Sequence, residues 1–180
     1  SIRGLRLSMQ KVECLAEMEV LWKNFTTVRG ALPYLRVDRV GQKKITSPHF
    51  YKSKGINLAI EFSKPLDASD IKRYNEMGYW VNQSFVIWLY ALMEYRGVIK
   101  SIDMTNPNGE DVNLLRRLRK IFAHTNGRYD ATDPKERKLF NAVINRYRPG
   151  IVDPERFNLQ IDEVLERMYL GVRKYVETRD

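Results

Sequence analysis

The chain has 180 residues, 43% of them hydrophobic, with a net charge of +9, one cysteine and two histidines. This length suits one well-filled core and is too short for two large domains, so we expect a single domain over residues 1–180. A lone cysteine, no Cys/His cluster with zinc-site spacing and no apolar run approaching the roughly 20 residues of a bilayer-spanning helix favour a cytoplasmic protein without membrane association, metal or cofactor.

The first expected element is a helix that begins after Ser8 and ends at Gly30. Its apolar residues recur at helical spacing and should pack together: Leu15, Met18, Trp22 and Phe25. Periodicity then fails over residues 31–63, where proline and glycine recur, so an irregular segment or short β insertion is expected. This segment has three open interpretations: a dimer arm, a nucleic-acid contact or two short strands.

A long helix is expected after Pro65, with Asp67 or Ser69 as its cap. Its second half, residues 81–95, is apolar nearly all round, which is typical of a central core helix. Its aromatic residues allow base stacking, but in an apolar helix they more often belong to the core, where we expect them: Tyr79, Trp80, Trp88 and Tyr90.

Three further helices complete the expected all-α bundle of about five helices. The first runs from about Glu110 to His124, and the second starts at Asp133, an N-cap followed by proline and a capping-box glutamate, and ends near Tyr147. Asp153-Pro154 repeats that start signal for the last helix. Its expected core stripe is Phe157, Ile161, Val164, Leu165, Met168, Val172 and Tyr175.

Most of the positive charge lies on the third of the five expected helices and on the segment that follows it through the fourth. Residues 116–148 contain ten Lys/Arg and three acids, a net charge of +7. Such an excess attracts polyanions, although a solvated basic face is an equally common explanation.

One of the two histidines lies at the end of this basic helix, in the pattern Arg119-x4-His124. Histidine transfers protons near neutral pH, and arginine holds phosphate with paired hydrogen bonds. Together these groups suit RNA cleavage by the ribose 2′-OH without a metal. The other histidine, His49, is a lone side chain in the irregular segment and is not expected to be catalytic.

The spacing restricts how these two residues cooperate. Positions five apart on a helix differ by about 140°, so Arg119 and His124 do not share a face. Both border an apolar stripe (Leu114, Leu115, Leu118, Ile121, Phe122), and a two-fold dimer formed through that stripe would bring Arg119 of one chain toward His124 of the other. Arg117, seven residues before His124, is the same-face partner if the site lies within one chain. A purely structural reading, with cations and a histidine ending the helix, also stands.

Residues 80–180, with an apolar helix ending Leu92-Met93-Glu94-Tyr95, a helix bearing R-x4-H and then an Asn-Gly turn, resemble the HEPN family of helical proteins. The resemblance implies a metal-independent endoribonuclease of the toxin or antiviral-defence type, a homodimer, and in some members a protein antitoxin. It implies catalytic roles for Arg119 and His124, and in such a site we expect Arg117 and Asn126 to be auxiliary ligands. Glu94, an acid near the end of the apolar helix, is expected to pair with a motif arginine and orient it. Lys120 departs from the family, which often has Asn there.

Three functions therefore remain open. The first is the endoribonuclease. The second is a non-catalytic helical module that binds RNA or a protein partner through the basic surface of residues 116–148. The third is a structural dimerisation domain in which the motif serves packing.

Overall fold

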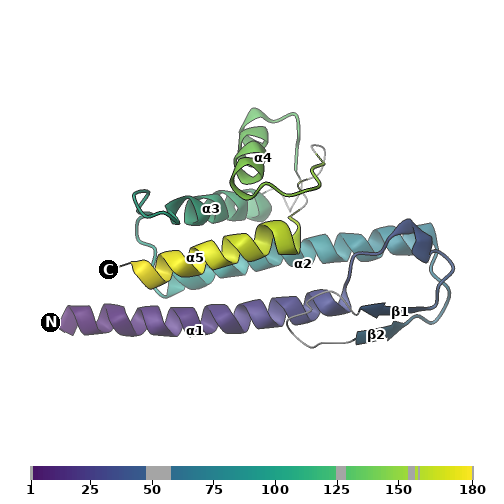
Figure 1. Cartoon of the computed structure of the whole chain (residues 1–180), viewed down its shortest axis with the longest axis horizontal. Coiled ribbons are helices and arrows are strands. Elements are labelled where there is room, and N and C mark those ends of the chain that lie inside the picture. Colours follow the sequence, from purple (N-terminus) through teal and green to yellow (C-terminus); the bar gives the residue numbers. More distant parts are fainter. Residues whose placement is uncertain (1, 48–57, 125–128, 154–156, 158, 180) are drawn as a thin grey trace. The chain divides into compact units, whose positions relative to one another are not determined.

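The computed structural model describes residues 2–47, 58–124, 129–153, 157 and 159–179. Within these ranges it contains five α-helices and a small antiparallel sheet (Figure 1): α1 Ile2–Ala31, β1 Lys44–Ser47, β2 Leu58–Glu61, α2 Ala68–Tyr95, α3 Gly109–His124, α4 Pro134–Tyr147 and α5 Glu166–Thr178, with short turns η1 Val37–Arg39 and η3 Ile161–Leu165. The prediction of an all-α bundle with a short β insertion is confirmed. No helix in the described ranges is both long and apolar enough to span a bilayer.

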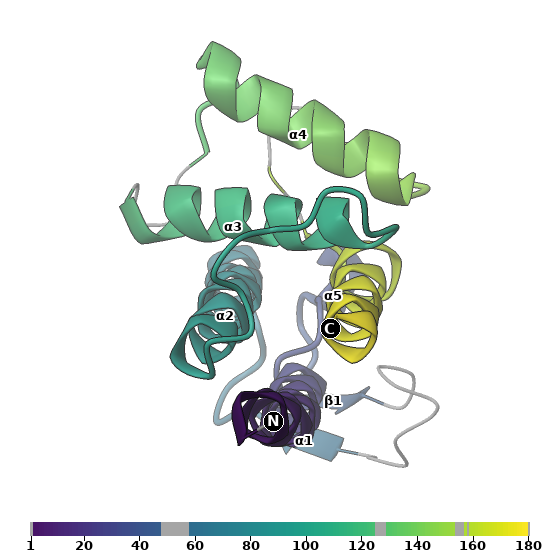
Figure 2. The same ribbon diagram turned by 90° about the vertical axis from the view of Figure 1, so that its left-hand side faces the viewer.

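The chain forms two compact units, residues 1–21 with 82–180 and residues 22–81. In the first unit α3 packs against α5 on one side and α4 on the other, so it is the middle layer of that helical stack (Figure 2). The core stripe expected for the last helix is buried from Ile161 to Tyr175. Burial also raises the pKa of Cys14 to about 11, so this thiol is neutral in the folded protein.

Two of the predicted helix starts are confirmed by their capping contacts. At the start of α2 the Asp67 carboxylate accepts the Asp70 N–H at 2.8 Å, and the Asp70 carboxylate accepts the Asp67 N–H at 3.2 Å. At the start of α4 the Asp133 carboxylate accepts the N–H groups of Lys135 and Glu136. These local contacts start each helix where the sequence predicts.

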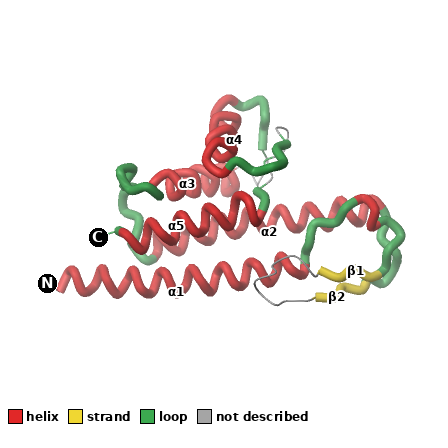
Figure 3. The backbone as a smooth tube through the Cα atoms, viewed as in Figure 1, coloured by secondary structure: helices red, strands yellow, loops and turns green. Residues whose placement is uncertain are grey.

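The second unit contains the insertion that the sequence left open. Residues 44–47 pair antiparallel with residues 58–61, so the described part of the insertion contains the two short strands that were one of its interpretations (Figure 3). A small core packs beside them: Leu35, Ile45, Leu66, Ile71 and Tyr74. His49 lies outside the described residues.

Three expectations about helices and their faces are wrong. The first helix begins at Ile2 rather than after Ser8. In the last segment the continuous helix expected after Asp153-Pro154 is not found: among the described residues Phe157 and Leu159 are not helical, and helical turns begin at Ile161. On α2, Trp80 and Trp88 are 68% and 66% exposed instead of belonging to the core, whereas Tyr90 is buried.

Candidate nucleic-acid site on helix α3

Helix α3 presents its polar residues to solvent because its apolar stripe is buried within the chain. Leu114, Leu115 and Leu118 are fully buried, and Phe122 is nearly so. The stripe therefore packs against the neighbouring helices α4 and α5. The prediction of a dimer contact through this stripe is wrong, because these side chains are buried within one chain and cannot contact a second copy.

A buried carboxylate fixes the first turn of α3. Asp111 is 2% exposed, and it accepts hydrogen bonds from Arg146 at 2.7 and 3.1 Å, from the Tyr147 hydroxyl at 2.7 Å and from Asn108 at 3.1 Å. Burial, with Asp111 beside it, raises the pKa of the Tyr147 hydroxyl, which stays protonated as a donor. This network joins α3 to α4 and sets the position of the basic helix.

An aromatic cluster holds the other end of α3, next to His124. The Phe122 ring lies edge-on to Phe157 with centroids 6.2 Å apart, and Phe157 contacts Phe140 and Tyr129 at 5.3 and 5.2 Å. Such edge-to-face contacts fix ring positions as well as burying area. The last turn of α3, and with it His124, is therefore anchored from its apolar side.

Arg119 lies between an acid and an aromatic ring, both on α2. Its Nη2 is 3.8 Å from Glu94 Oε2, and its guanidinium carbon lies 5.5 Å from the centroid of the Tyr90 ring. The prediction that Glu94 pairs with a motif arginine is thus confirmed as a contact. Because both side chains are substantially exposed, this ion pair stabilises the fold by only about 0–1 kcal/mol. Arg119 can therefore exchange Glu94 for a phosphate.

Tyr90 belongs to this site, although the sequence analysis assigned it only to the core. It lies one turn before Glu94 on the same face of α2. Residues at this spacing are neighbours on the helix surface, so both can contact the same partner, Arg119. Burial raises the pKa of its hydroxyl, and Glu94 adds to the effect. Tyr90 is therefore a neutral platform under Arg119 rather than a base at neutral pH.

The remaining predicted residues are distributed around the end of α3. His124 is exposed in the last position of the helix, Lys120 is exposed, and Arg117 is partly buried. Because α3 is helical throughout 119–124, Arg119 and His124 point about 140° apart, as the spacing predicts. Asn126 lies outside the described residues.

Arg116 gives a useful contrast on the same helix. It is exposed and donates to Asn113 at 3.0 Å, with no described carboxylate within ion-pair distance. Across the described residues, no group of three or more His, Cys, Asp or Glu side chains is arranged to hold a metal ion.

Comparison with protein-family models, curated proteins and solved structures finds no match for this chain. The HEPN resemblance therefore depends on the R-x4-H spacing and on the two helices that carry Glu94 and Arg119.

Proposed function

We propose that the protein binds RNA at the basic surface around α3 and cleaves it without a metal. One observation carries the proposal: Arg119 and His124 are both accessible on a helix that is anchored at its two ends, in a region of net charge +7. A fixed helix supplies the positioning that proton transfer to a bound substrate requires.

Each motif residue has a distinct role in the proposed reaction. The ribose 2′-OH attacks the adjacent phosphorus, the bond to the 5′ oxygen breaks, and His124 transfers the proton as acid or base. Because Arg119 and His124 of one chain point about 140° apart, Arg119 of the second copy in a homodimer binds the phosphate oxygens on which charge develops, and Glu94 orients that arginine. Arg117, Lys120 and Asn126 supply auxiliary contacts to the substrate.

A non-catalytic binding module is the second candidate, and two observations favour it. Lys120 occupies the place where the resembling family often has asparagine, and Arg119 already contacts Glu94. The same basic surface would then bind RNA electrostatically, or a protein partner such as an antitoxin. We place either activity in the cytoplasm, the compartment in which a lone thiol such as Cys14 stays reduced.

RNA incubated with the protein in EDTA should be cut to products with 2′,3′-cyclic phosphate ends. DNA and 2′-O-methyl RNA should survive, because the attacking hydroxyl is missing or blocked. Mass spectrometry of the product ends checks the chemistry. Cleavage only after magnesium is restored would contradict the proposal.

We further propose that the protein is a homodimer that pairs through α2. Residues 77–93 contain no charged side chain, yet Trp88 and Tyr95 are 66% and 81% exposed on one face of this helix. A helix that is apolar all round is ordinarily covered, and large exposed aromatic residues mark interfaces. The exposed face is defined by Ser84, Ile87, Trp88, Ala91, Leu92 and Tyr95.

This face is complementary to itself in an antiparallel two-fold pairing. With the axis midway between positions 88 and 91, Trp88 lies opposite Ala91, and Tyr95 lies opposite Ser84 of the second copy. Ile87 then lies opposite Leu92, and all three pairs point in the same direction on the helical wheel. In two of the three pairs a large side chain meets a small one, which is the pattern of a packed helix pair.

The expected area suits a dimer of modest affinity. Covering Trp88 and Tyr95 in both copies removes roughly 600 Å² of exposed surface, given that each such side chain buries 150–250 Å². Ile87, Ala91 and Leu92 bring the total toward the roughly 1,000 Å² of a small specific interface.

Trp88→Glu should therefore convert a dimer into a monomer at micromolar concentration, because two carboxylates would face an apolar partner. Sedimentation velocity measures the change. Leu170→Glu is the matched control, since Leu170 is an exposed apolar residue on α5, outside this face. A wild-type monomer at high micromolar concentration, or equal behaviour of the two variants, would rule out this interface.

A further inference from the structure

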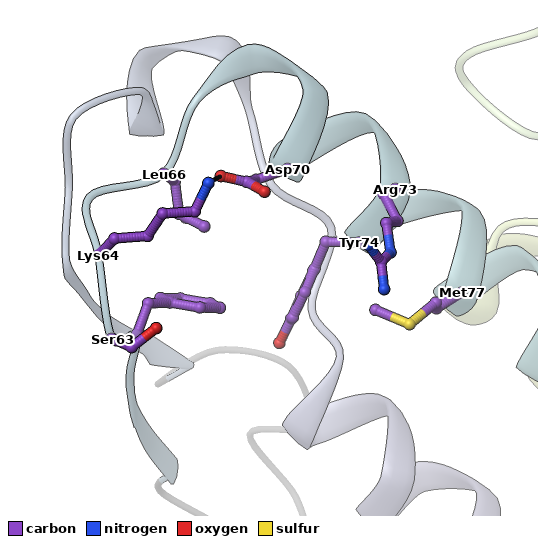
Figure 4. A pocket seen from close by; sticks show the side chains of 8 residues that line it. Ser63, Lys64, Leu66, Asp70, Arg73, Tyr74 and Met77 are labelled. Atoms are coloured by element: carbon purple, nitrogen blue, oxygen red, sulfur yellow. Dashed lines mark ion pairs between the residues drawn. The ribbon is translucent and has the colours of Figure 1, made fainter.

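A small hollow in the second unit has the chemistry of a ligand site. It has a volume of about 260 Å³ and lies between the end of β2 and the first turns of α2, lined by Phe62, Ser63, Lys64, Leu66, Asp70, Arg73, Tyr74 and Met77. Lys64 and Asp70 lie on one side, Arg73 and Met77 on the other, with Tyr74 between them (Figure 4). Ligand sites typically combine such an apolar floor with a few placed polar groups.

The two cations that line the hollow differ in whether a carboxylate of the protein already pairs with them. Lys64 Nζ is 3.1 Å from Asp70 Oδ2 and 3.6 Å from Asp67 Oδ2, so two carboxylates balance the charge of this lysine. Arg73 makes no ion pair with any carboxylate of the described ranges, so among the lining cations its guanidinium binds an anion without first giving up a carboxylate. An arginine so placed suits a phosphate, which it binds with two parallel hydrogen bonds.

The middle of the hollow suits a planar ring. Tyr74 is held in place because its hydroxyl donates to the Ala31 carbonyl at 2.5 Å, and Phe62 lies edge-on to it with centroids 5.8 Å apart. The Met77 thioether adds a polarisable, adaptable surface. The volume is slightly below the range of about 300–1,000 Å³ typical of sites for drug-sized ligands, so it admits one ring system rather than a large ligand.

The acid on the Lys64 side keeps one acceptor atom. The Asp67 N–H and the Lys64 ammonium both contact Oδ2 of Asp70. Oδ1 therefore retains capacity for a ligand donor such as an exocyclic amino group.

We propose that this hollow binds a nucleotide with an amino-bearing base. The base lies among Phe62, Tyr74 and Met77, its amino group donates to Asp70, and its phosphate is held by Arg73. The ligand is either a free mononucleotide or one nucleotide of an RNA strand. The site lies within residues 22–81 and is independent of the cleavage proposed for α3.

Calorimetric titration of the full chain with AMP tests the site. AMP should saturate at one equivalent, and Arg73→Ala should weaken it about tenfold through loss of a charge-assisted hydrogen bond. Lys72→Ala, which removes the same charge from the neighbouring exposed position outside the lining, should change affinity less than twofold. IMP, in which a carbonyl oxygen on C6 replaces the amino group facing Asp70, should bind several-fold more weakly than AMP.

A short oligoadenylate distinguishes the two sources of the nucleotide. Tighter binding than AMP with the same loss in Arg73→Ala identifies an RNA strand, whereas binding of AMP alone identifies a free nucleotide. The proposal is overturned if neither ligand depends on Arg73, or if Lys72→Ala and Arg73→Ala weaken binding equally, since binding would then reflect diffuse charge only.

Discussion

Replacing His124 with alanine is expected to lower RNA cleavage by about two or more orders of magnitude, the usual loss when a general acid or base is removed. RNA affinity and the melting temperature should stay nearly unchanged, because the exposed side chain at the end of α3 contributes little to the core. Single-turnover cleavage, RNA binding and thermal unfolding measured on the same preparation separate chemistry from binding and from folding.

Two arginines on α3 provide the comparison. Arg119→Ala should impair both turnover and binding, because a guanidinium contacts phosphate in the ground state and more strongly in the transition state. Arg116→Ala removes the same charge from the outer face and should weaken binding only, by an amount that falls as salt rises. If the His124→Ala variant cleaves RNA as fast as the wild type, or if the variant unfolds, the histidine has a structural role and the binding module is favoured.

Glu94 can be tested as a positioning residue beside Arg119. Glu94→Gln removes the negative charge while keeping the size of the side chain, so RNA affinity should rise slightly at low salt. If Glu94 orients the guanidinium, turnover at saturating RNA should fall even though affinity does not. That split between kcat and KM would not arise from a merely structural contact.

The sequence predicted those parts of the fold that depend on contacts within a few residues. Asp67 and Asp133 cap their helices as expected, because a cap is a contact between neighbours in the chain. The bounds of α3 and the buried stripe after Ile161 follow from periodicity in the same way. Asp153-Pro154 did not predict the helix correctly, since Phe157 and Leu159 after it are not helical. A capping motif shows that a helix could begin there, but not that the following residues form one.

Tertiary contacts set the limits of that prediction. Periodicity shows that α2 is apolar all round, but it does not reveal which side finds a partner within the chain, so the exposure of Trp80 and Trp88 was not foreseen. The stripe of α3 was likewise recognised, while its burial against α4 and α5 was not. In the site, the pairing of Glu94 with Arg119 was foreseen from its position at the end of an apolar helix.

The buried network of Asp111 was the least predictable feature. Asp111 lies in the first turn of α3, where an acid is usual on account of the helix dipole alone. Its partners Arg146 and Tyr147 come 35 and 36 residues later, and the close approach of Gly171 comes from a third helix. Only the folded chain brings these groups together.

Gly171→Ala is expected to lower the free energy of unfolding by about 3 kcal/mol, the scale of overpacking combined with damage to a buried ion pair. A Cβ at this position of α5 would overlap the Asp111 carboxylate, which cannot retreat because Arg146, Tyr147 and Asn108 hold it. Helix propensity alone has the opposite sign, since alanine in place of glycine stabilises a helix interior by about 1 kcal/mol. The direction of the change therefore shows which effect wins.

Denaturant unfolding of Gly171→Ala, with Gly150→Ala as its control, measures this effect. A Cβ at Gly150 would meet only an ordinary contact with Glu163 at 3.5 Å, so that variant should stay within about 0.5 kcal/mol of wild type.

Asp111→Ala should itself cost about 3 kcal/mol, because it leaves the Tyr147 hydroxyl buried without its acceptor. The double variant Asp111→Ala/Gly171→Ala should be less destabilised than the sum of the two, since the overlapping carboxylate is gone. A stabilised Gly171→Ala, or strict additivity, would mean that α5 shifts to accept the methyl group and that Asp111 does not fix α3 against it.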